Sequence, residues 1–254
     1  MKNILVPIDF SENTRNAAQF AASLAEITGA RIILFHVFNP VLVQQQVTTT
    51  KDNTIFETVA QELLDNLAHE LHQEYGVSVT RLIKPGFAED EVPALAKRIH
   101  ADLVVVALNN RIEETEPMPG VLETALLTNA NLAVLGVPIQ VKFRADDLIT
   151  VWQAAAPTSD NYISLNFVGQ LTPEEALKEL ETRKVQKEDL LPDEPIRNLS
   201  PVTESTFPVL EETYSIPQFP ETETTPIDIP EAATILNQNV WKQNPDVGIL
   251  FLPV

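Results

Sequence analysis

The sequence predicts an α/β protein with a doubly wound, mostly parallel five-stranded sheet over residues 1–140 and a degenerate second α/β domain over residues 141–254. Short apolar runs, typical of strands buried on both faces, alternate with helical patterns throughout the first half. The charge balance then changes near residue 145. Residues 1–144 hold 11 Lys and Arg against 17 Asp and Glu, whereas residues 145–254 hold 6 against 19.

The first half begins with an apolar strand, Ile4–Ile8, and a helix that Ser11 can cap and Gly29 can close. A long amphipathic helix is expected from near Ile55 to Tyr75. Further strands are expected at residues 31–37, 77–83, 102–106 and 132–137, and further helices at residues 92–99 and 120–129. Because helices connect successive strands, the crossovers should be right-handed and the sheet parallel.

The second half is less regular. Strands are expected at residues 147–153, 162–168 and 247–252, and helices at residues 173–187 and 230–242. Residues 192–230 hold eight of the nineteen prolines and no glycine, so we expect this segment to be extended or disordered. The apolar final strand must be buried against another part of the chain.

Composition excludes several functional classes. Cysteine is absent, so the chain has neither disulfides nor thiolate metal sites. The formal charge of −19 argues against nucleic acid and anionic membrane surfaces as partners, since both require a cationic surface. No apolar run reaches the roughly 18 residues of a membrane span, and the opening residues do not resemble a secretory signal. We therefore expect a cytoplasmic protein.

Four segments of the first half resemble, in order and spacing, the universal stress protein family. These segments are Lys2–Ser11, Gly29–Val37, Pro85–Gly86 and Ala101–Val106. The resemblance implies an adenine nucleotide alpha hydrolase-like fold and a role in stress responses. It also implies that the fifth strand mediates dimers or, in tandem proteins, the same contact within one chain. We expect Leu132–Phe143 to make this contact, to the second half or to another subunit.

ATP-binding members of that family carry a glycine-rich loop: Gly, two residues, Gly, nine residues, then Gly followed by Ser or Thr. The same spacing falls here on Ala107, Asn110, Gly120 and Val121, so three of the four residue types differ. Ala107 adds a methyl group where bare backbone would approach a phosphate, and Val121 offers no hydroxyl. Asn110 tolerates a left-handed backbone and can preserve the turn.

The span between these positions is also acidic. It contains Glu113, Glu114 and Glu116, balanced only by Arg111. A carboxylate about 5 Å from a phosphate charge costs roughly 3 kcal/mol at an effective dielectric constant near 20. The sequence therefore predicts that ATP does not bind and that no cofactor is required.

Asp9 follows the first strand and has two interpretations. In nucleotide-binding relatives the matching Asp contacts the nucleoside, whereas an Asp here can equally tether the turn between strand and helix, which we favour. If a ligand binds, the candidate residues are Asp9, Val37, Ala107, Asn110, Gly120 and Val121.

The remaining groups of polar residues give little evidence for metal binding or catalysis. His69 and His72 lie three residues apart on the long helix, but a metal site needs a third ligand, and a solvated helix face explains the pair equally well. His36 ends an apolar strand and should bond to backbone. No Ser/His/Asp arrangement with nucleophile-elbow glycines occurs, so we expect no enzymatic activity.

Two questions stay open in the sequence. The second half is either a degenerate tandem copy of the first or an unrelated acidic extension that packs one or two strands against it. For function, the first hypothesis is a non-enzymatic stress-response protein that acts through protein contacts. The alternative is a sensor that binds a small molecule or nucleotide through Asp9 and the altered loop at residues 107–121.

Overall fold

The computed structural model describes residues 1–39, 52–108, 121–127, 131–139, 141–143, 148–154, 165–188 and 248–252. Residues 40–51, the acidic span within residues 109–120 and the proline-rich segment at residues 192–230 lie outside them. The described strands are β1 (Asn3–Pro7), β2 (Arg31–Phe38), β3 (Val79–Pro85), β4 (Leu103–Leu108), β5 (Val134–Pro138), β6 (Ile149–Ala154), β7 (Leu165–Leu171) and β8 (Ile249–Leu252). The described helices are α1 (Glu12–Thr28), α3 (Asp52–Tyr75), α4 (Ala88–Arg98), α5 (Val121–Leu127) and α6 (Pro173–Glu188).

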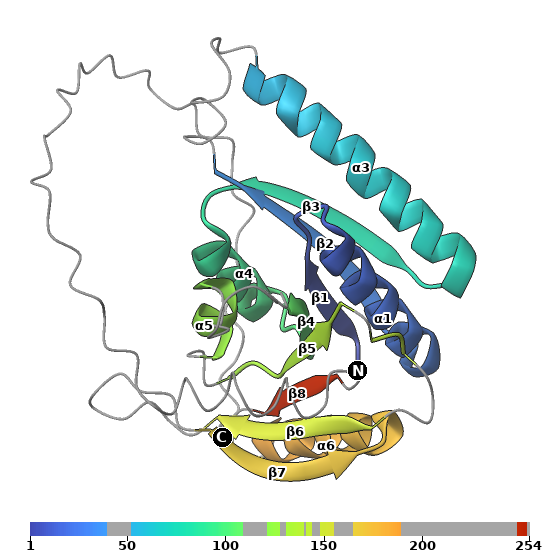
Figure 1. The fold of residues 1–254 in the computed structure, drawn as a ribbon, viewed down its shortest axis with the longest axis vertical. Helices are drawn as coiled ribbons and strands as arrows, with labels where there is room; N and C mark the ends of the chain where they lie inside the picture. The colour runs from blue at the N-terminus through green and yellow to red at the C-terminus, as the bar shows by residue number, and fades with distance from the viewer. Residues whose placement is uncertain are drawn as a thin grey trace, which may run out of the picture.

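The strands form one sheet in the order β3-β2-β1-β4-β5-β8-β6-β7 (Figure 1). Strands β1 to β5 pair in parallel, which confirms the predicted α/β fold of the first half. Chain order reverses beside β1, since β2 lies on one side of it and β4 on the other. This is the switch point at which doubly wound sheets bind ligands.

The second half extends the same sheet. Strand β8 pairs antiparallel with β5 and parallel with β6, and β6 pairs antiparallel with β7. The edge of β5, which we expected to contact the second half or another subunit, is thus paired with β8 of the same chain. All four β8 side chains are buried, which explains the apolar character of this segment. The tandem-copy interpretation stays a prediction.

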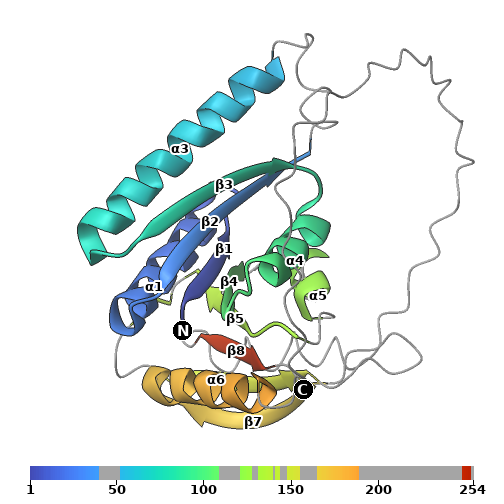
Figure 2. The ribbon, with the colours of Figure 1, turned by 180° about the vertical axis from the view of Figure 1, so that it is seen from behind.

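Two apolar cores flank the sheet. Helices α1 and α3 cover one face, and α4 and α5 cover the other, as the two opposite views show (Figures 1 and 2). Helix α6 adds Ala176 and Leu177 to the core beneath α1, so both halves of the chain share this core. Alternate residues of each strand supply the two cores because successive side chains point to opposite faces.

Local signals determine both ends of helix α1. The Ser11 side chain accepts a hydrogen bond from the Thr14 N–H, and Gly29 adopts a left-handed conformation with φ of 67°, as the sequence predicts. Helix α4 begins earlier than expected, at Ala88. Its first turn carries Glu89, Asp90 and Glu91, and negative charge there is favourable beside the helix N-terminus.

Asp102, just before β4, ties the chain start to helix α6. Its carboxylate accepts hydrogen bonds from the backbone N–H groups of Lys2 (2.6 Å) and Asn3 (2.8 Å), and it pairs with the Lys184 ammonium. Burial alone would raise the pKa of Asp102, but the Lys184 and backbone hydrogen bonds outweigh it and lower this pKa. Helix α6 is therefore held to the first half by a charged contact as well as by its core residues.

We expect Asp102→Ala to lower the free energy of unfolding by about 1.5–3 kcal/mol. The substitution removes a mostly buried carboxylate, so its charge-assisted hydrogen bonds are lost. Lys184→Ala is the matched control. Lys184 is 43% exposed, so its loss should cost less than about 1 kcal/mol. Urea unfolding of both variants tests this ranking, and equal effects of the two substitutions would contradict it.

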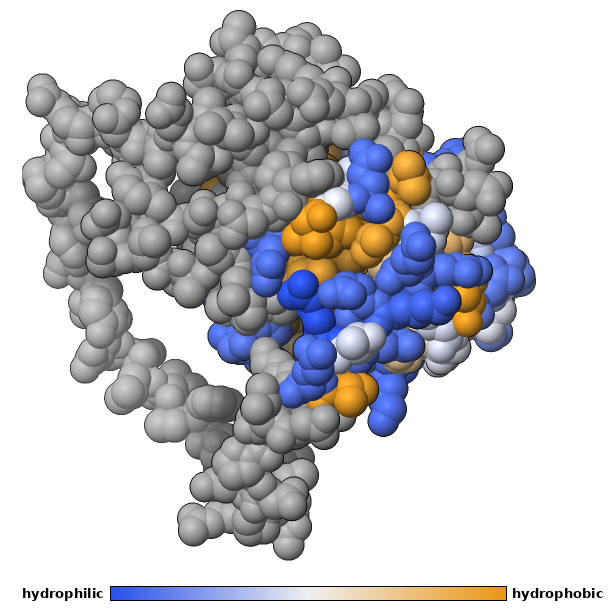
Figure 3. Space-filling view, turned by 90° about the horizontal axis from the view of Figure 1, so that it is seen from below, coloured by the Kyte–Doolittle hydropathy of each residue, from blue (hydrophilic) through white to orange (hydrophobic). Residues whose placement is uncertain are grey.

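The surface of the second half mixes polar and apolar side chains. Figure 3 shows the end of the molecule that carries β7 and α6, where hydrophilic residues are interrupted by separate apolar patches. Leu148, Val168 and Val185 are the exposed large apolar side chains in the described part of the second half. Among the described helices, none is both long and apolar enough to cross a membrane.

Candidate functional site

The turn after β1 places Asp9 at the switch point of the sheet. The Ile8 N–H donates to the Phe35 carbonyl of β2 (2.9 Å), which holds the turn against the neighbouring strand. Asp9 Oδ1 accepts hydrogen bonds from the Ser11 N–H and the Thr14 hydroxyl, both at 2.8 Å. Asp9 therefore tethers the turn into α1, which is the structural role we favoured from the sequence.

These contacts keep Asp9 ionised. Burial alone would raise the pKa of Asp9, but the hydrogen bonds from Ser11 and Thr14 outweigh it and lower this pKa below its ordinary value. A carboxylate at this place is a fixed negative charge at neutral pH. It can accept hydrogen bonds from donors such as ribose hydroxyls, and it repels phosphates.

His36 supports the turn from the end of β2. Its side chain is buried, and its Nδ1 lies 2.7 Å from the Ile8 carbonyl oxygen, which confirms the expected bond to backbone. A carbonyl accepts, so Nδ1 carries the proton in the neutral ring. The buried Nε2 has no hydrogen-bond partner among the described residues. Burial lowers the pKa of His36, and this effect exceeds the opposing effects of the Ile8 bond and the Asp9 charge.

Aromatic rings surround His36 on several sides. The ring centroids of Phe10, Phe38 and Phe56 lie 4.5, 6.4 and 6.2 Å from that of the imidazole. Phe10 adopts φ of 67°, an uncommon backbone for a bulky residue, and its ring contacts the imidazole. The turn that presents Asp9 is thus held by apolar contacts as well as by hydrogen bonds.

The other candidate ligand residues do not converge on one face of the sheet. Val37 packs with the core under α4 and α5, whereas Ala107 packs with the core under α1 and α3. Val121 begins α5, and its side chain is 69% exposed. Asn110 and Gly120 lie outside the described residues. The structure therefore places Asp9, Val37, Ala107 and Val121 but does not gather them into one closed site.

The structure shows two further features that the sequence analysis did not identify. Burial raises the pKa of Glu123, an additional carboxyl on α5 two residues after Val121. A single Glu in the first turn of a helix has no distinguishing pattern, so only the structure identifies it.

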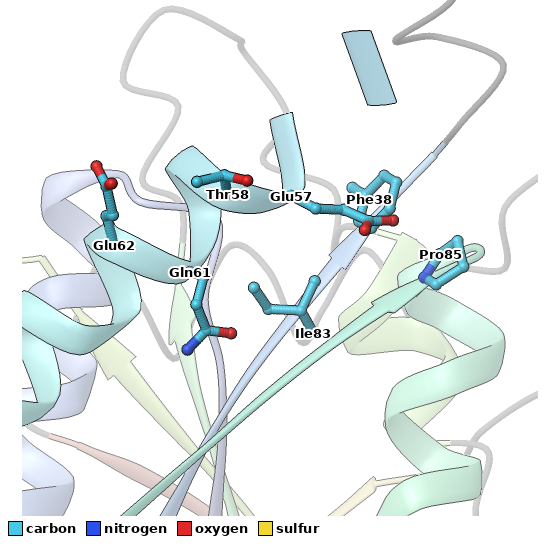
Figure 4. A pocket seen from close by; sticks show the side chains of 7 residues that line it. All are labelled: Phe38, Glu57, Thr58, Gln61, Glu62, Ile83 and Pro85. Carbon is cyan, nitrogen blue, oxygen red and sulfur yellow. The ribbon is translucent and has the colours of Figure 1, made fainter. Parts of the chain in front are cut away.

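The second feature is a cavity of about 410 Å³ where β2 and β3 end beside α3 (Figure 4). It is lined by Phe38, Glu57, Thr58, Gln61, Glu62, Ile83 and Pro85. These residues come from three separate segments of the chain, so no local motif could have indicated the cavity. None of them is among the candidate residues that the sequence suggested.

The His69 and His72 pair does not gather a metal-ligand set. Among the described residues, no group of three His, Cys, Asp or Glu side chains lies close enough to hold an ion. His72 Nδ1 lies 2.9 Å from the Val77 carbonyl oxygen, so this histidine helps to connect α3 to the segment before β3.

Comparison with known proteins identifies relatives of the first half. A family described as the universal stress protein family matches residues 1–137. No curated protein matches the chain.

Solved structures that match the chain include universal stress proteins from three organisms. UspA from Lactobacillus plantarum is 17% identical, with 55% of this chain and 97% of that chain covered and a TM-score of 0.42. The protein from Archaeoglobus fulgidus is 21% identical, with 54% and 98% covered and a TM-score of 0.43. A family member from Arabidopsis thaliana, solved with AMP bound, is 17% identical, with 58% and 96% covered and a TM-score of 0.38.

Proposed function

Because the chain belongs to the universal stress protein family, we propose that it is a non-enzymatic stress-response protein that does not bind ATP and acts through protein contacts. The observation that carries this proposal is the chemistry of the phosphate-binding pattern. At its two altered positions within the described residues, a methyl group (Ala107) and an exposed isopropyl group (Val121) replace bare backbone and a hydroxyl. Neither side chain can donate a hydrogen bond to a phosphate.

The electrostatics of the switch point favour the same conclusion. Asp9 is a carboxylate whose pKa is lowered, and its Oδ1 already accepts two hydrogen bonds within the turn. The sequence adds three glutamates between the altered positions, and the whole chain carries a charge of −19. A triphosphate would approach several negative charges with few donors to offset them.

The proposal assigns the function of this chain to contacts with other proteins. The second half extends the sheet and carries, in its described part, three exposed large apolar side chains, Leu148, Val168 and Val185, which a protein partner would bury on binding. Self-association through Leu132–Phe143 stays a proposal. In this chain, the edge of β5 that faces away from β4 is paired with β8.

Thermal unfolding with a ligand panel tests the proposal. ATP, AMP, cyclic AMP and adenosine are each added to the full chain. A ligand at 100 times its dissociation constant adds about 2.7 kcal/mol of stability, which raises the melting temperature measurably. We expect no shift with any of the four. A shift with adenosine alone would favour the alternative, a nucleoside sensor that uses Asp9, and a shift with ATP would contradict the proposal.

A reconstruction of the loop gives a sharper prediction. Restoring the family pattern with Ala107→Gly, Asn110→Gly and Val121→Ser should not confer ATP binding, because the acidic span remains. Replacing the three glutamates of that span by glutamine in the same variant should improve affinity for ATP at least tenfold. Equilibrium dialysis with labelled ATP measures both variants, and micromolar affinity in the first variant alone would show that charge is not the barrier.

A further inference from the structure

The cavity beside α3 adjoins the aromatic cluster around His36, with which it shares Phe38, but none of the candidate ligand residues of the switch point lines it. Its apolar floor comes from the strand ends, with Phe38 at the end of β2 and Ile83 and Pro85 at the end of β3 (Figure 4). Phe38 is only 5% exposed, and its ring centroid lies 5.4 Å from that of Phe56. The cavity volume of about 410 Å³ falls within the range of small-molecule sites, about 300–1,000 Å³.

Helix α3 contributes the polar side of the cavity. Figure 4 shows the Glu57 side chain reaching towards Phe38 and the Gln61 side chain pointing from the helix towards the strands, while Glu62 points away from the floor. Glu57 and Glu62 make no ion pair with the residues that the structure describes. The rim therefore carries two carboxylates without a counterion in this part of the chain.

The orientation of Gln61 is set by a short network. Its amide Nε2 donates to Asp65 Oδ1 (2.8 Å), and the same carboxylate oxygen pairs with the Arg81 guanidinium (2.8 Å). Nε2 gives one of its two hydrogens to Asp65, so Gln61 keeps its Oε1 as an acceptor and a second N–H as a donor for a ligand. The network thus presents another acceptor to the cavity.

The cations closest in the sequence to the lining residues are already paired. Arg81 is engaged with Asp65, and Lys84 of β3 pairs with Glu91 of α4. The described residues that line the cavity include no Lys, Arg or His. An anionic ligand would be repelled by the carboxylates of the rim, whereas a cation is attracted by them.

We propose that this cavity binds an organic cation, an ammonium or guanidinium group joined to a flat apolar body. The cationic group lies beside the Glu57 carboxylate and donates hydrogen bonds to Glu57 and to Gln61 Oε1. The apolar body covers Ile83 and Pro85. The site is formed by α3 and the ends of β2 and β3.

Titration calorimetry of the full chain with three matched probes tests the class of ligand. 2-Phenylethylammonium is the cation, 2-phenylethanol the neutral analogue and phenylacetate the anion, all with one phenyl ring. We expect the cation to bind at least tenfold more tightly than the other two. Equal affinity for the three probes, or no saturable binding of the cation, would overturn the proposal.

Charge-neutral variants then locate the site. The double variant Glu57→Gln/Glu62→Gln should weaken binding of 2-phenylethylammonium at least tenfold. The control Glu74→Gln/Glu174→Gln removes the same charge from exposed positions outside the cavity and should change affinity less than twofold. All four substituted glutamates are exposed, so the fold is retained. If the control weakens binding as much as the double variant, the cavity is not the site.

Discussion

Replacing Leu250 by aspartate is expected to destabilise the protein severely. Leu250 is 1% exposed in β8, opposite Leu135 of β5 and Val151 of β6. Loss of a buried Leu costs about 2–5 kcal/mol, and a buried unpaired carboxylate adds several more. We therefore expect the free energy of unfolding, measured in urea, to fall by about 4 kcal/mol or more.

Val185→Asp provides the matched control, because it makes a similar chemical change on α6 at a side chain that is 58% exposed. Its cost should stay below about 1 kcal/mol. Amide hydrogen exchange should also show that Leu250→Asp, and not the control, removes protection from β5 and β6. If the two variants had similar stability, β8 would not be the strand that joins the two halves of the sheet.

Acid should destabilise the protein through His36. The pKa of His36 is lowered in the folded state, so below its ordinary value of about 6.5 the unfolded chain takes up a proton that the folded chain does not. The stabilisation is complete above that pH and is lost as the pH falls towards the lowered pKa. One such proton gives a slope of at most about 1.4 kcal/mol per pH unit in this window.

His36→Phe should flatten this dependence by the equivalent of one proton, because phenylalanine can retain the ring contacts with Phe10 and Phe38 but does not titrate. At pH 7 the variant should be less stable by about 1–3 kcal/mol, since the Ile8 carbonyl loses its donor. His69→Gln, at an exposed position on α3, should leave the slope unchanged. Urea unfolding from pH 5 to pH 7.5 measures all three proteins, and an unaltered slope in His36→Phe would show that another group senses the acid.

Much of the first half could be predicted because its signals are local. Continuous apolar runs indicated the parallel strands, and Ser11 and Gly29 marked the ends of α1. The place of β8 could not be predicted in the same way. Its apolar residues indicate burial, but no local pattern says which strands it joins, since β7 ends at Leu171 and β8 begins only at Ile249.

The same distinction between local and distant contacts applies to the candidate site. The tether made by Asp9 involves Ser11 and Thr14, close neighbours in the sequence, and a turn role for Asp9 could be predicted. The rings of Phe10 and Phe56 reach His36 from other segments of the chain, and the cavity beside α3 is likewise built from distant residues. Such groupings depend on the tertiary fold, so a single sequence does not show them.

We propose that the altered loop at residues 107–121 no longer binds phosphates. Nuclear magnetic resonance of the ¹⁵N-labelled full chain during titration with magnesium ATP tests this most directly. The amides of residues 107, 108 and 121–127 report on binding at the place where ATP-binding members of the family hold phosphates. We predict no saturable shift of these amides up to millimolar ATP. Saturable shifts there with a micromolar dissociation constant would show that the altered loop still holds a triphosphate.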